Sequence, residues 1–467
     1  MTPISIDIPE ILILVSVHLG LEDIVHCTLV NKVWYTVFAP LCFREINSSN
    51  ARSAALERYC PHATRLIISM TSPIFNIIAP KCTHLTELQV RGPGSSTTSI
   101  SKTWIAFLQS NPRINKVTSL ELTPESLSVL TEHCPNLQEL VVRGFEFGYH
   151  REGAKSNGTL VSPLWRIAQG LSSLDLGFNS FTVHMNALLP CPDPAGLPML
   201  RHLVLGASYS SLLDQTRLIS AAKNLESLAW DMEHVRMGET GVQTCREMFA
   251  SLQHLQDLRL FLPEKQIFLR GDELVEFLIL LPPCVKELHV PSYSPWRITD
   301  VEIHGSLSQQ FPLLEVLNLR GWNVASMVDV VLCSCRRLRV LDCYTLRASS
   351  MIETPEVTPV SDENETGSRG VGPLGWVCSG LETLNVRFVD CKDDKARRCL
   401  FDQLCCMKEL KSVIVGGLDP VRIHWQEGEI PKTWGALGHV KDEISDIPWM
   451  RETWPRLESF RTYGKAS

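Results

Sequence analysis

Several classes of protein are excluded by what this 467-residue sequence lacks. It has no run of lysines and arginines and its net charge is -7, whereas nucleic-acid binders carry a basic stripe. It also has no Gly-x-Ser-x-Gly, His-Glu-x-x-His or Gly-x-x-x-x-Gly-Lys motif, and its 14 histidines are scattered. We therefore expect neither a nucleic-acid-binding protein nor an enzyme.

The sequence is also short of long hydrophobic runs. The most apolar stretch near either terminus, from Ile8 to Trp34, has no lysine or arginine before Lys32, so the basic region of a secretion signal is missing. Acidic residues at positions 10, 22 and 23 interrupt it well short of the roughly 20 apolar residues of a membrane span. We expect an intracellular protein, cytoplasmic or nuclear, that is neither secreted nor embedded in a membrane.

Metal-binding cysteine pairs are absent as well. The chain has 16 cysteines but no Cys-x-x-Cys spacing, and its close pairs are Cys333 with Cys335 and Cys405 with Cys406. In an intracellular chain such cysteines are expected to be reduced thiols. We therefore expect no metal site, and most of the cysteines fit a different pattern.

That pattern is an internal repeat of the form apolar-x-x-Leu-x-x-Leu-x-apolar. It is clearest in CTHLTELQVRG from Cys82, CPNLQELVVRG from Cys134 and CSGLETLNVRF from Cys378. We name the first Leu-type position of each unit its anchor. Fourteen anchors are predicted: Ala63, Leu85, Val117, Leu137, Leu171, Leu200, Leu225, Leu255, Val285, Leu314, Leu338, Leu381, Leu410 and Leu457.

The position three residues before each anchor is never charged or strongly polar in this alignment, and in five units it is cysteine: Cys60, Cys82, Cys134, Cys335 and Cys378. Unreactive cysteine is a small, readily buried residue, so these five are predicted to pack in a core. In Leu-x-Leu the two leucines point to one side of a short strand, and stacked strands would form a continuous apolar row. Thr123 and Pro124 also predict the start of a helix between two strands.

The repeats resemble the leucine-rich repeats, in particular the cysteine-containing, ribonuclease-inhibitor-like class, from about Cys60 to the C-terminus. The resemblance implies an α/β fold in which units stack into a solenoid. Two insertions interrupt it, one at about 351–375 that is predicted to be disordered and one at about 418–451 that is rich in tryptophan and predicted to cap the array. Gly370, Gly372 and Gly375 match a dinucleotide fingerprint but lack a preceding strand, so we expect no cofactor.

The first 46 residues do not follow the repeat frame and show helical spacing instead. They contain Ile8-Pro9-Glu10-Ile11-Leu12, then Leu21-Glu22-Asp23-Ile24, Leu29-Val30-Asn31-Lys32-Val33-Trp34, and finally Pro40-Leu41 with Phe43. This series resembles an F-box, with one residue fewer after Pro9 than is usual. We therefore divide the chain into a short all-helical docking module, residues 1–46, and a leucine-rich-repeat solenoid, residues 47–467.

An F-box followed by leucine-rich repeats implies the substrate-recognition subunit of an SCF-type ubiquitin ligase. In that family the box docks on the Skp-type adaptor, which links it to the cullin, and the repeats capture a target protein. The resemblance assigns these candidate adaptor-binding residues: Pro9, Leu12, Ile13, Leu19, Ile24, Leu29, Val30 and Trp34. The pattern leaves open whether each of them, Trp34 in particular, meets the adaptor or packs inside the module.

The target protein is expected on the strand positions that face away from the core. Acids recur at the second position after the anchor, in Glu87, Glu139, Asp257 and Glu287. Arginine and aromatic residues are enriched at interface hot spots, and they define the candidate substrate-binding set: Arg91, Arg143, Phe261, Arg320, Tyr344 and Arg387. Two alternatives remain open, namely that these are ordinary solvated residues, and that the chain is a leucine-rich-repeat scaffold acting outside any ubiquitin ligase.

Overall fold

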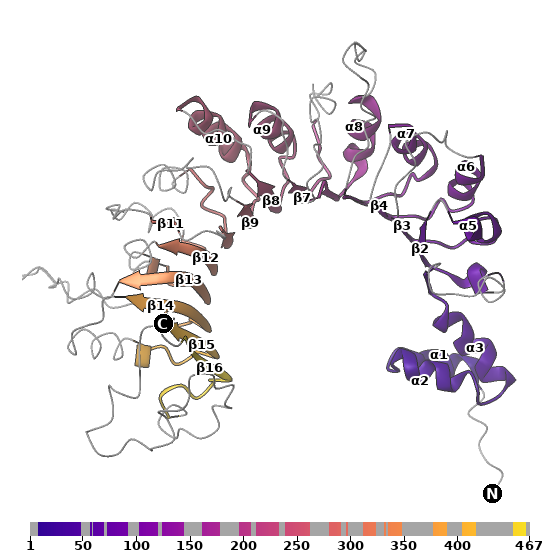
Figure 1. Ribbon diagram of the computed structural model, residues 1–467, viewed down its shortest axis with the longest axis horizontal. Helices are drawn as coiled ribbons and strands as arrows, with labels where there is room; N and C mark the ends of the chain where they lie inside the picture. Colours follow the sequence, from indigo (N-terminus) through magenta and orange to yellow (C-terminus); the bar gives the residue numbers. More distant parts are fainter. Residues whose placement is uncertain are drawn as a thin grey trace, which may run out of the picture. The chain divides into compact units, whose positions relative to one another are not determined.

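The structure is a computed structural model, and Figure 1 shows its course. It describes residues 8–47, 57, 59–69, 72–91, 102–119, 124–143, 161–177, 196–206, 212–232, 239–261, 280–290, 296–297, 312–323, 331–332, 335–347, 377–389, 404–416 and 452–463. Both predicted insertions, 351–375 and 418–451, lie outside these residues. The chain divides into two compact units, Met1–Asn224 and Leu225–Ser467.

In its described residues the first unit contains seven parallel strands that are hydrogen-bonded in chain order. They are β1 (Glu45–Asn47), β2 (Arg65–Ser69), β3 (Glu87–Arg91), β4 (Lys116–Ser119), β5 (Glu139–Val142), β6 (Ser173–Asp175) and β7 (His202–Leu205). The helices between them lie on one side of the strands (Figure 1), and they are α5 (Pro73–Ile78), α6 (Lys102–Gln109), α7 (Pro124–His133), α8 (Val161–Gly170) and α9 (Leu212–Ala221). The helix predicted after Thr123 is confirmed as α7.

The described residues of the second unit repeat this arrangement with nine strands, of which eight follow one another in the sheet and β11 pairs with β12. They are β8 (Ser227–Asp231), β9 (Asp257–Phe261), β10 (Glu287–His289), β11 (Trp296–Arg297), β12 (Val316–Asn323), β13 (Val340–Arg347), β14 (Thr383–Val389), β15 (Ser412–Gly416) and β16 (Ser459–Tyr463). Helix α10 (Glu239–Ser251) separates its first two strands. The expected α/β fold is confirmed, because parallel strands in chain order are consistent with a leucine-rich-repeat solenoid.

One recurring hydrogen-bond pattern sets the register of these strands. Within each of the two compact units, the carbonyl of the residue after an anchor accepts the N–H groups of the two residues that follow the next anchor. In the first unit, for example, the Thr64 oxygen accepts from Thr86 at 2.8 Å and from Glu87 at 3.0 Å. In the second unit the Glu382 oxygen accepts from Lys411 at 2.7 Å and Ser412 at 3.0 Å. The anchors of neighbouring repeats are thus held at the same level along their strands.

The strand register corrects the predicted anchor of the third repeat. Val117 pairs with Leu88 and Leu140, which lie three residues after their anchors, so Val117 is not itself an anchor. The anchor of this unit is Ile114, and the position three residues earlier is Asn111, which is fully buried. The expectation that no strongly polar residue occupies this position is therefore wrong for this unit.

Asn111 is accommodated because its side-chain amide replaces a backbone hydrogen bond in the turn of the preceding repeat. In most units the anchor N–H donates to the carbonyl three residues before it, as Leu137 does to Cys134 at 3.1 Å. In the preceding turn, Leu85 instead donates to Asn111 Oδ1 at 3.1 Å, and Asn111 Nδ2 donates to the Cys82 carbonyl at 2.7 Å. The same amide nitrogen donates to the Phe107 carbonyl at 2.9 Å. One side chain thus satisfies a buried turn from the neighbouring unit.

The five cysteines of the repeat are buried, as predicted for core packing. Burial raises the pKa of the Cys134 thiol to about 12 and that of the Cys335 thiol to about 11, because the low-dielectric core disfavours the thiolate. Cys60 and Cys82 also hydrogen-bond to each other, and burial raises the pKa of both. These thiols act as small apolar side chains.

Alkylation should therefore distinguish two kinds of cysteine at neutral pH. Since the thiolate is the reactive form, a pKa of about 11 or about 12 lowers reactivity at neutral pH at least roughly 100-fold relative to an ordinary thiol. We expect Cys134 and Cys335 to be protected from iodoacetamide while the exposed Cys406 reacts, as measured by mass spectrometry of the native protein. The difference should vanish in denaturant, and equal native labelling of all three would contradict core packing.

Three short helices precede the first repeat: α1 (Pro9–Ser16), α2 (Leu21–Cys27) and α3 (Lys32–Cys42). Asn31 caps α3, since its Oδ1 accepts the Trp34 N–H at 2.9 Å. The sheet begins inside the segment assigned to the docking module, because Glu45, Ile46 and Asn47 of β1 pair with β2. Strand β1 therefore joins the predicted docking module to the sheet of the first repeat.

Candidate protein-interaction surfaces

The three N-terminal helices expose an unusual amount of apolar surface. Among the described residues, 14 large hydrophobic side chains are exposed, and 11 of them belong to this short segment. We call these 11 the N-terminal apolar surface: Ile8, Ile11, Ile13, Leu14, Val15, Val17, Leu21, Val25, Leu29, Val30 and Val33. Its most exposed members are Leu29 at 78%, Val17 at 73% and Leu14 at 68%. A concentration of exposed apolar side chains is typical of an interaction site.

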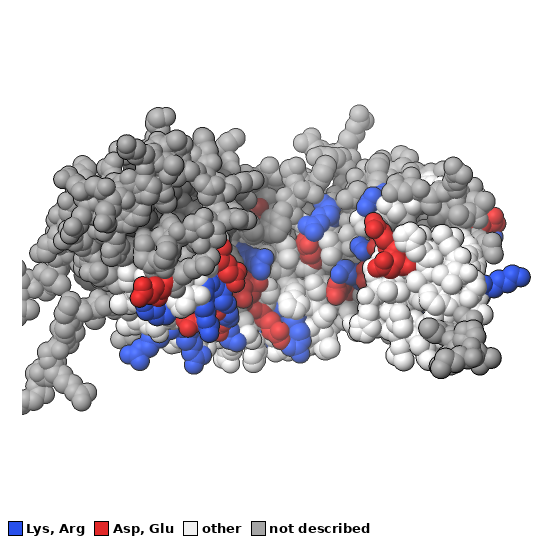
Figure 2. Space-filling model, turned by 90° about the horizontal axis from the view of Figure 1, so that it is seen from below, with Lys and Arg blue, Asp and Glu red and all other residues white. Residues whose placement is uncertain are grey.

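The helices cannot bury this surface because they have only a small interior of their own. That interior consists of Leu12 on α1 and Phe38 and Ala39 on α3, each at most 3% exposed. Trp34 packs on Phe38 with ring centroids 5.5 Å apart. The charged residues Glu10, Glu22, Asp23 and Lys32 are also exposed on this module. The part of Figure 2 that corresponds to α1–α3 in Figure 1, on the right, is largely uncharged.

The candidate adaptor-binding residues fall into three groups. Pro9, Ile13, Leu29 and Val30 are exposed, and Leu19, Ile24 and Trp34 are half-buried. Leu12 is buried inside the module, which is a placement that helical periodicity did not reveal. Leu14, Val17 and Leu21 were not in the predicted set, although they are more exposed than Ile13.

Aromatic contacts fix the module to the repeats. The Phe43 ring stacks on Tyr59 with centroids 3.8 Å apart and an interplanar angle of 2°. The hydroxyl of Tyr35 on α3 hydrogen-bonds to that of Tyr59, which lies just before the first repeat turn. Together with the pairing of β1 and β2, these contacts determine the direction in which the N-terminal apolar surface points relative to the first strands.

The second candidate surface is the strand face opposite the core. On β1 to β5 its second position alternates in charge: Glu45, Arg65, Glu87, Lys116 and Glu139. Arg65 contacts Glu45 at 2.8 Å and Glu87 at 3.4 Å, and Lys116 contacts Glu139 at 2.6 Å. Basic and acidic side chains accordingly lie next to one another in Figure 2. The acids at this position are thus partnered by Arg65 and Lys116 of neighbouring strands.

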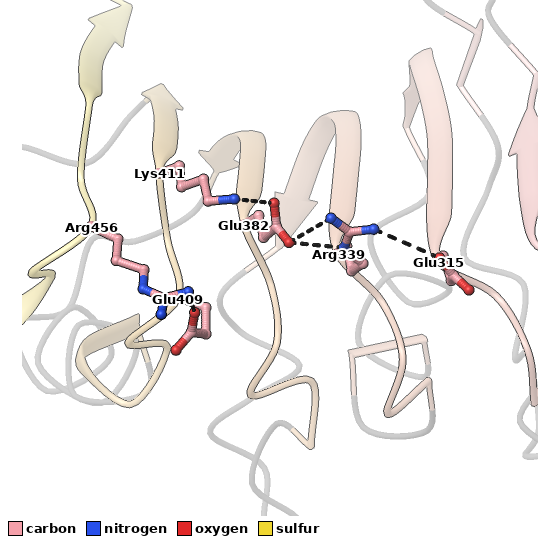
Figure 3. A network of polar contacts seen from close by, with 6 residues as sticks. All are labelled: Glu315, Arg339, Glu382, Glu409, Lys411 and Arg456. Carbon is pink, nitrogen blue, oxygen red and sulfur yellow. Dashed lines mark hydrogen bonds and ion pairs between the residues drawn. The ribbon is translucent and has the colours of Figure 1, made fainter.

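A similar network crosses the second unit one residue earlier in the repeat (Figure 3). Glu382 accepts from Arg339 at 2.7 Å on one side and from Lys411 at 2.7 Å on the other, and Arg339 also lies 3.9 Å from Glu315. The hydrogen bond from Lys411, followed by that from Arg339, lowers the pKa of the Glu382 carboxyl. Arg456 and Glu409 form a separate ion pair. Exposed pairs of this kind contribute little to stability.

The candidate substrate-binding residues lie in, or directly after, six different strands. Arg91 is exposed at the end of β3, whereas Arg143 is half-buried and contacts Asp175 at 3.2 Å. Phe261 is half-buried at the end of β9. Arg320, Tyr344 and Arg387 lie in β12, β13 and β14, but their side chains are outside the described part of the structure.

No family model matches this sequence, and no curated protein matches it. Solved structures do match. One is a leucine-rich-repeat-containing protein, LegL7, from Legionella pneumophila, with 11% identity, 85% of this chain and 89% of that chain covered, and a TM-score of 0.33. Another is a chain in the crystal structure of the Rad7 and Elc1 complex in yeast, with 15% identity, the same two coverages and a TM-score of 0.34. Because both scores are low, we assign the fold from the strand order of this chain.

No helix in the described part of the chain combines the length and the apolar character that crossing a membrane demands.

Proposed function

We propose that this chain is the substrate-recognition subunit of an SCF-type ubiquitin ligase. In this proposal the N-terminal apolar surface binds a Skp-type adaptor, which connects the chain to a cullin, and the strand face of the repeats binds a target protein. The observation that carries it is the concentration of exposed large apolar side chains in residues 8–33, which hold 11 of the 14 found in the described residues.

The resemblance to an F-box supplies the identity of the partner. The residues that carry it include Ile13, Leu29 and Val30, which are exposed and belong to the N-terminal apolar surface. Lys32, at the start of α3, is exposed and keeps its charge in water. An apolar centre with a charged rim is the usual organisation of a protein–protein interface.

The attachment of the module to the repeats supports a positional role. The β1–β2 pairing and the stacking of Phe43 on Tyr59 hold the module against the first repeat. A target bound to the first strands would then be held in a defined direction from the adaptor. On this proposal the chain performs no bond chemistry, and it acts by raising the effective concentration of a target lysine near the ubiquitin-charged enzyme.

Binding to a purified Skp-type adaptor tests the proposal. We expect the intact chain to form a stoichiometric complex by gel filtration and calorimetry. The double variant Ile13→Asp and Leu29→Asp should weaken binding at least roughly 100-fold, because two charges would be desolvated in the interface. Both side chains are exposed, at 54% and 78%, so the melting temperature should not change.

Met199→Asp is the matched control. Met199 is 58% exposed in the same unit and lies far along the chain from α1–α3, so its variant should bind the adaptor normally. Absence of binding by the unmodified chain, or equal binding by the double variant, would contradict the ligase proposal and favour a repeat scaffold that acts outside any ligase.

A further inference from the structure

Three side chains with metal-binding groups converge on two neighbouring strands of the second unit. Asp257 lies at the start of β9, and Glu287 and His289 lie at the two ends of β10. One ligand atom from each, a carboxylate oxygen or an imidazole nitrogen, lies within 4.8 Å of the others. The proposed function assigns no metal ion to this cluster.

The repeat places all three on the same face. Leu258 and Leu288 between them are fully buried, and side chains alternate along a strand, so Asp257, Glu287 and His289 point away from the core. Asp257 and Glu287 also face each other in register across β9 and β10. Two adjacent carboxylates with no bound cation between them repel each other, and this repulsion is reduced when a cation lies between them.

His289 gives the second, independent indication. Its Nε2 is buried and has no hydrogen-bond partner among the residues that the structure describes. The nearest carboxylate oxygen, Glu287 Oε2, is 3.7 Å away, which is too long for a hydrogen bond. An unsatisfied buried nitrogen is unfavourable, and a metal ion between this nitrogen and the two carboxylates would satisfy it.

We propose that Asp257, Glu287 and His289 bind a zinc ion. Imidazole with carboxylates suits zinc better than magnesium or calcium, which prefer oxygen ligands alone. Zinc is held at about 2.0–2.2 Å by such ligands, so the three side chains must rotate toward one another when the ion binds. Three protein ligands leave the fourth tetrahedral position open for water or for a group from a bound protein.

Two neighbours of Asp257 have opposite effects on this site. Ser227 on β8 donates to Asp257 Oδ2 at 3.0 Å and orients the carboxylate. Arg259 on β9 contacts the same carboxylate through Nε at 3.3 Å and through a terminal nitrogen at 3.2 Å. Arg259 is half exposed, and it must turn into solvent when the metal binds. Removing Arg259 should therefore strengthen zinc binding, whereas removing His289 should weaken it.

The experiment measures zinc affinity of the full-length chain by competition with a chromophoric chelator. We expect one equivalent to bind, His289→Ala to lose more than the roughly 10- to 100-fold that an outer-shell change costs, and Arg259→Ala to gain affinity. Glu287→Gln should weaken binding and barely affect melting without metal, because Glu287 is close to half exposed.

Cobalt substitution separates this site from the thiols. A cobalt spectrum without thiolate charge-transfer absorption is expected, since the three ligands are nitrogen and oxygen. Thiolate absorption, or equal zinc affinity in the wild type and the His289→Ala and Arg259→Ala variants, would overturn the proposal. The opposite signs expected for the two variants could not arise from a general loss of folding.

Discussion

Replacement of Leu12 by alanine is expected to destabilise the three-helix module by about 2–5 kcal/mol. Leu12 is 1% exposed and belongs to an interior that consists of few side chains, so the cavity cannot be filled by rearrangement of a large core. Adaptor binding should weaken as a consequence, although Leu12 lies beneath the contact surface. Hydrogen exchange of the α1–α3 amides measures the loss, which should be confined to this module.

Leu12→Met is the conservative control, because a swap of similar volume in a core typically costs less than about 1.5 kcal/mol. We expect it to retain both the exchange protection and most of the affinity for the adaptor. If Leu12→Ala abolished binding while the amides stayed protected, Leu12 would contact the adaptor directly, as the F-box resemblance suggested.

Replacement of Asn111 by cysteine is expected to destabilise the first unit by about 2–4 kcal/mol. Comparison of the repeats alone would favour this change, since cysteine is the commonest residue at the position. In the structure it would remove the bonds that Asn111 makes to the Leu85 N–H and to the Cys82 carbonyl. Each buried group left without a partner costs about 1–3 kcal/mol.

Urea unfolding followed by far-UV circular dichroism measures this change. Cys134→Ala, at the equivalent position of the next unit, is the control for a small loss of apolar volume without any loss of hydrogen bonds. An unchanged midpoint for Asn111→Cys would mean that the Cys82–Leu85 turn closes on itself, as the turns of most other units do.

The repeat frame could be read from the sequence because its information lies in buried apolar residues. The predicted anchor is wrong at Val117. An alignment anchored at Val117 fits the apolar pattern through Leu120, whereas the correct alignment, anchored at Ile114, places the polar Asn111 at an apolar position. A buried asparagine is allowed there by hydrogen bonds to another unit, which no local pattern shows. Strand β1 was missed for a related reason, since Phe43 and Ile46 had been assigned to the helical module.

The two surfaces were less predictable than the frame. Helical spacing groups Leu12 and Ile13 with other apolar residues, but it does not say which side of a small module faces inward. The strand pattern identifies buried positions and leaves the opposite face undetermined. His289 could have been noticed, because Glu287-Leu288-His289 follows the acid Asp257 of the preceding unit in the same frame.

The carbonyl that joins successive repeats affects how the length of the segments between strands can change in evolution. Arg339 accepts from Glu382 and Thr383, and Lys411 accepts from Glu458 and Ser459, with the same geometry as between closely spaced units. Strand alignment is therefore independent of the length of chain between two strands. Mutation can lengthen the segments between strands at only a small, logarithmic entropic cost. New recognition loops can thus evolve without displacing the residues of the strand face.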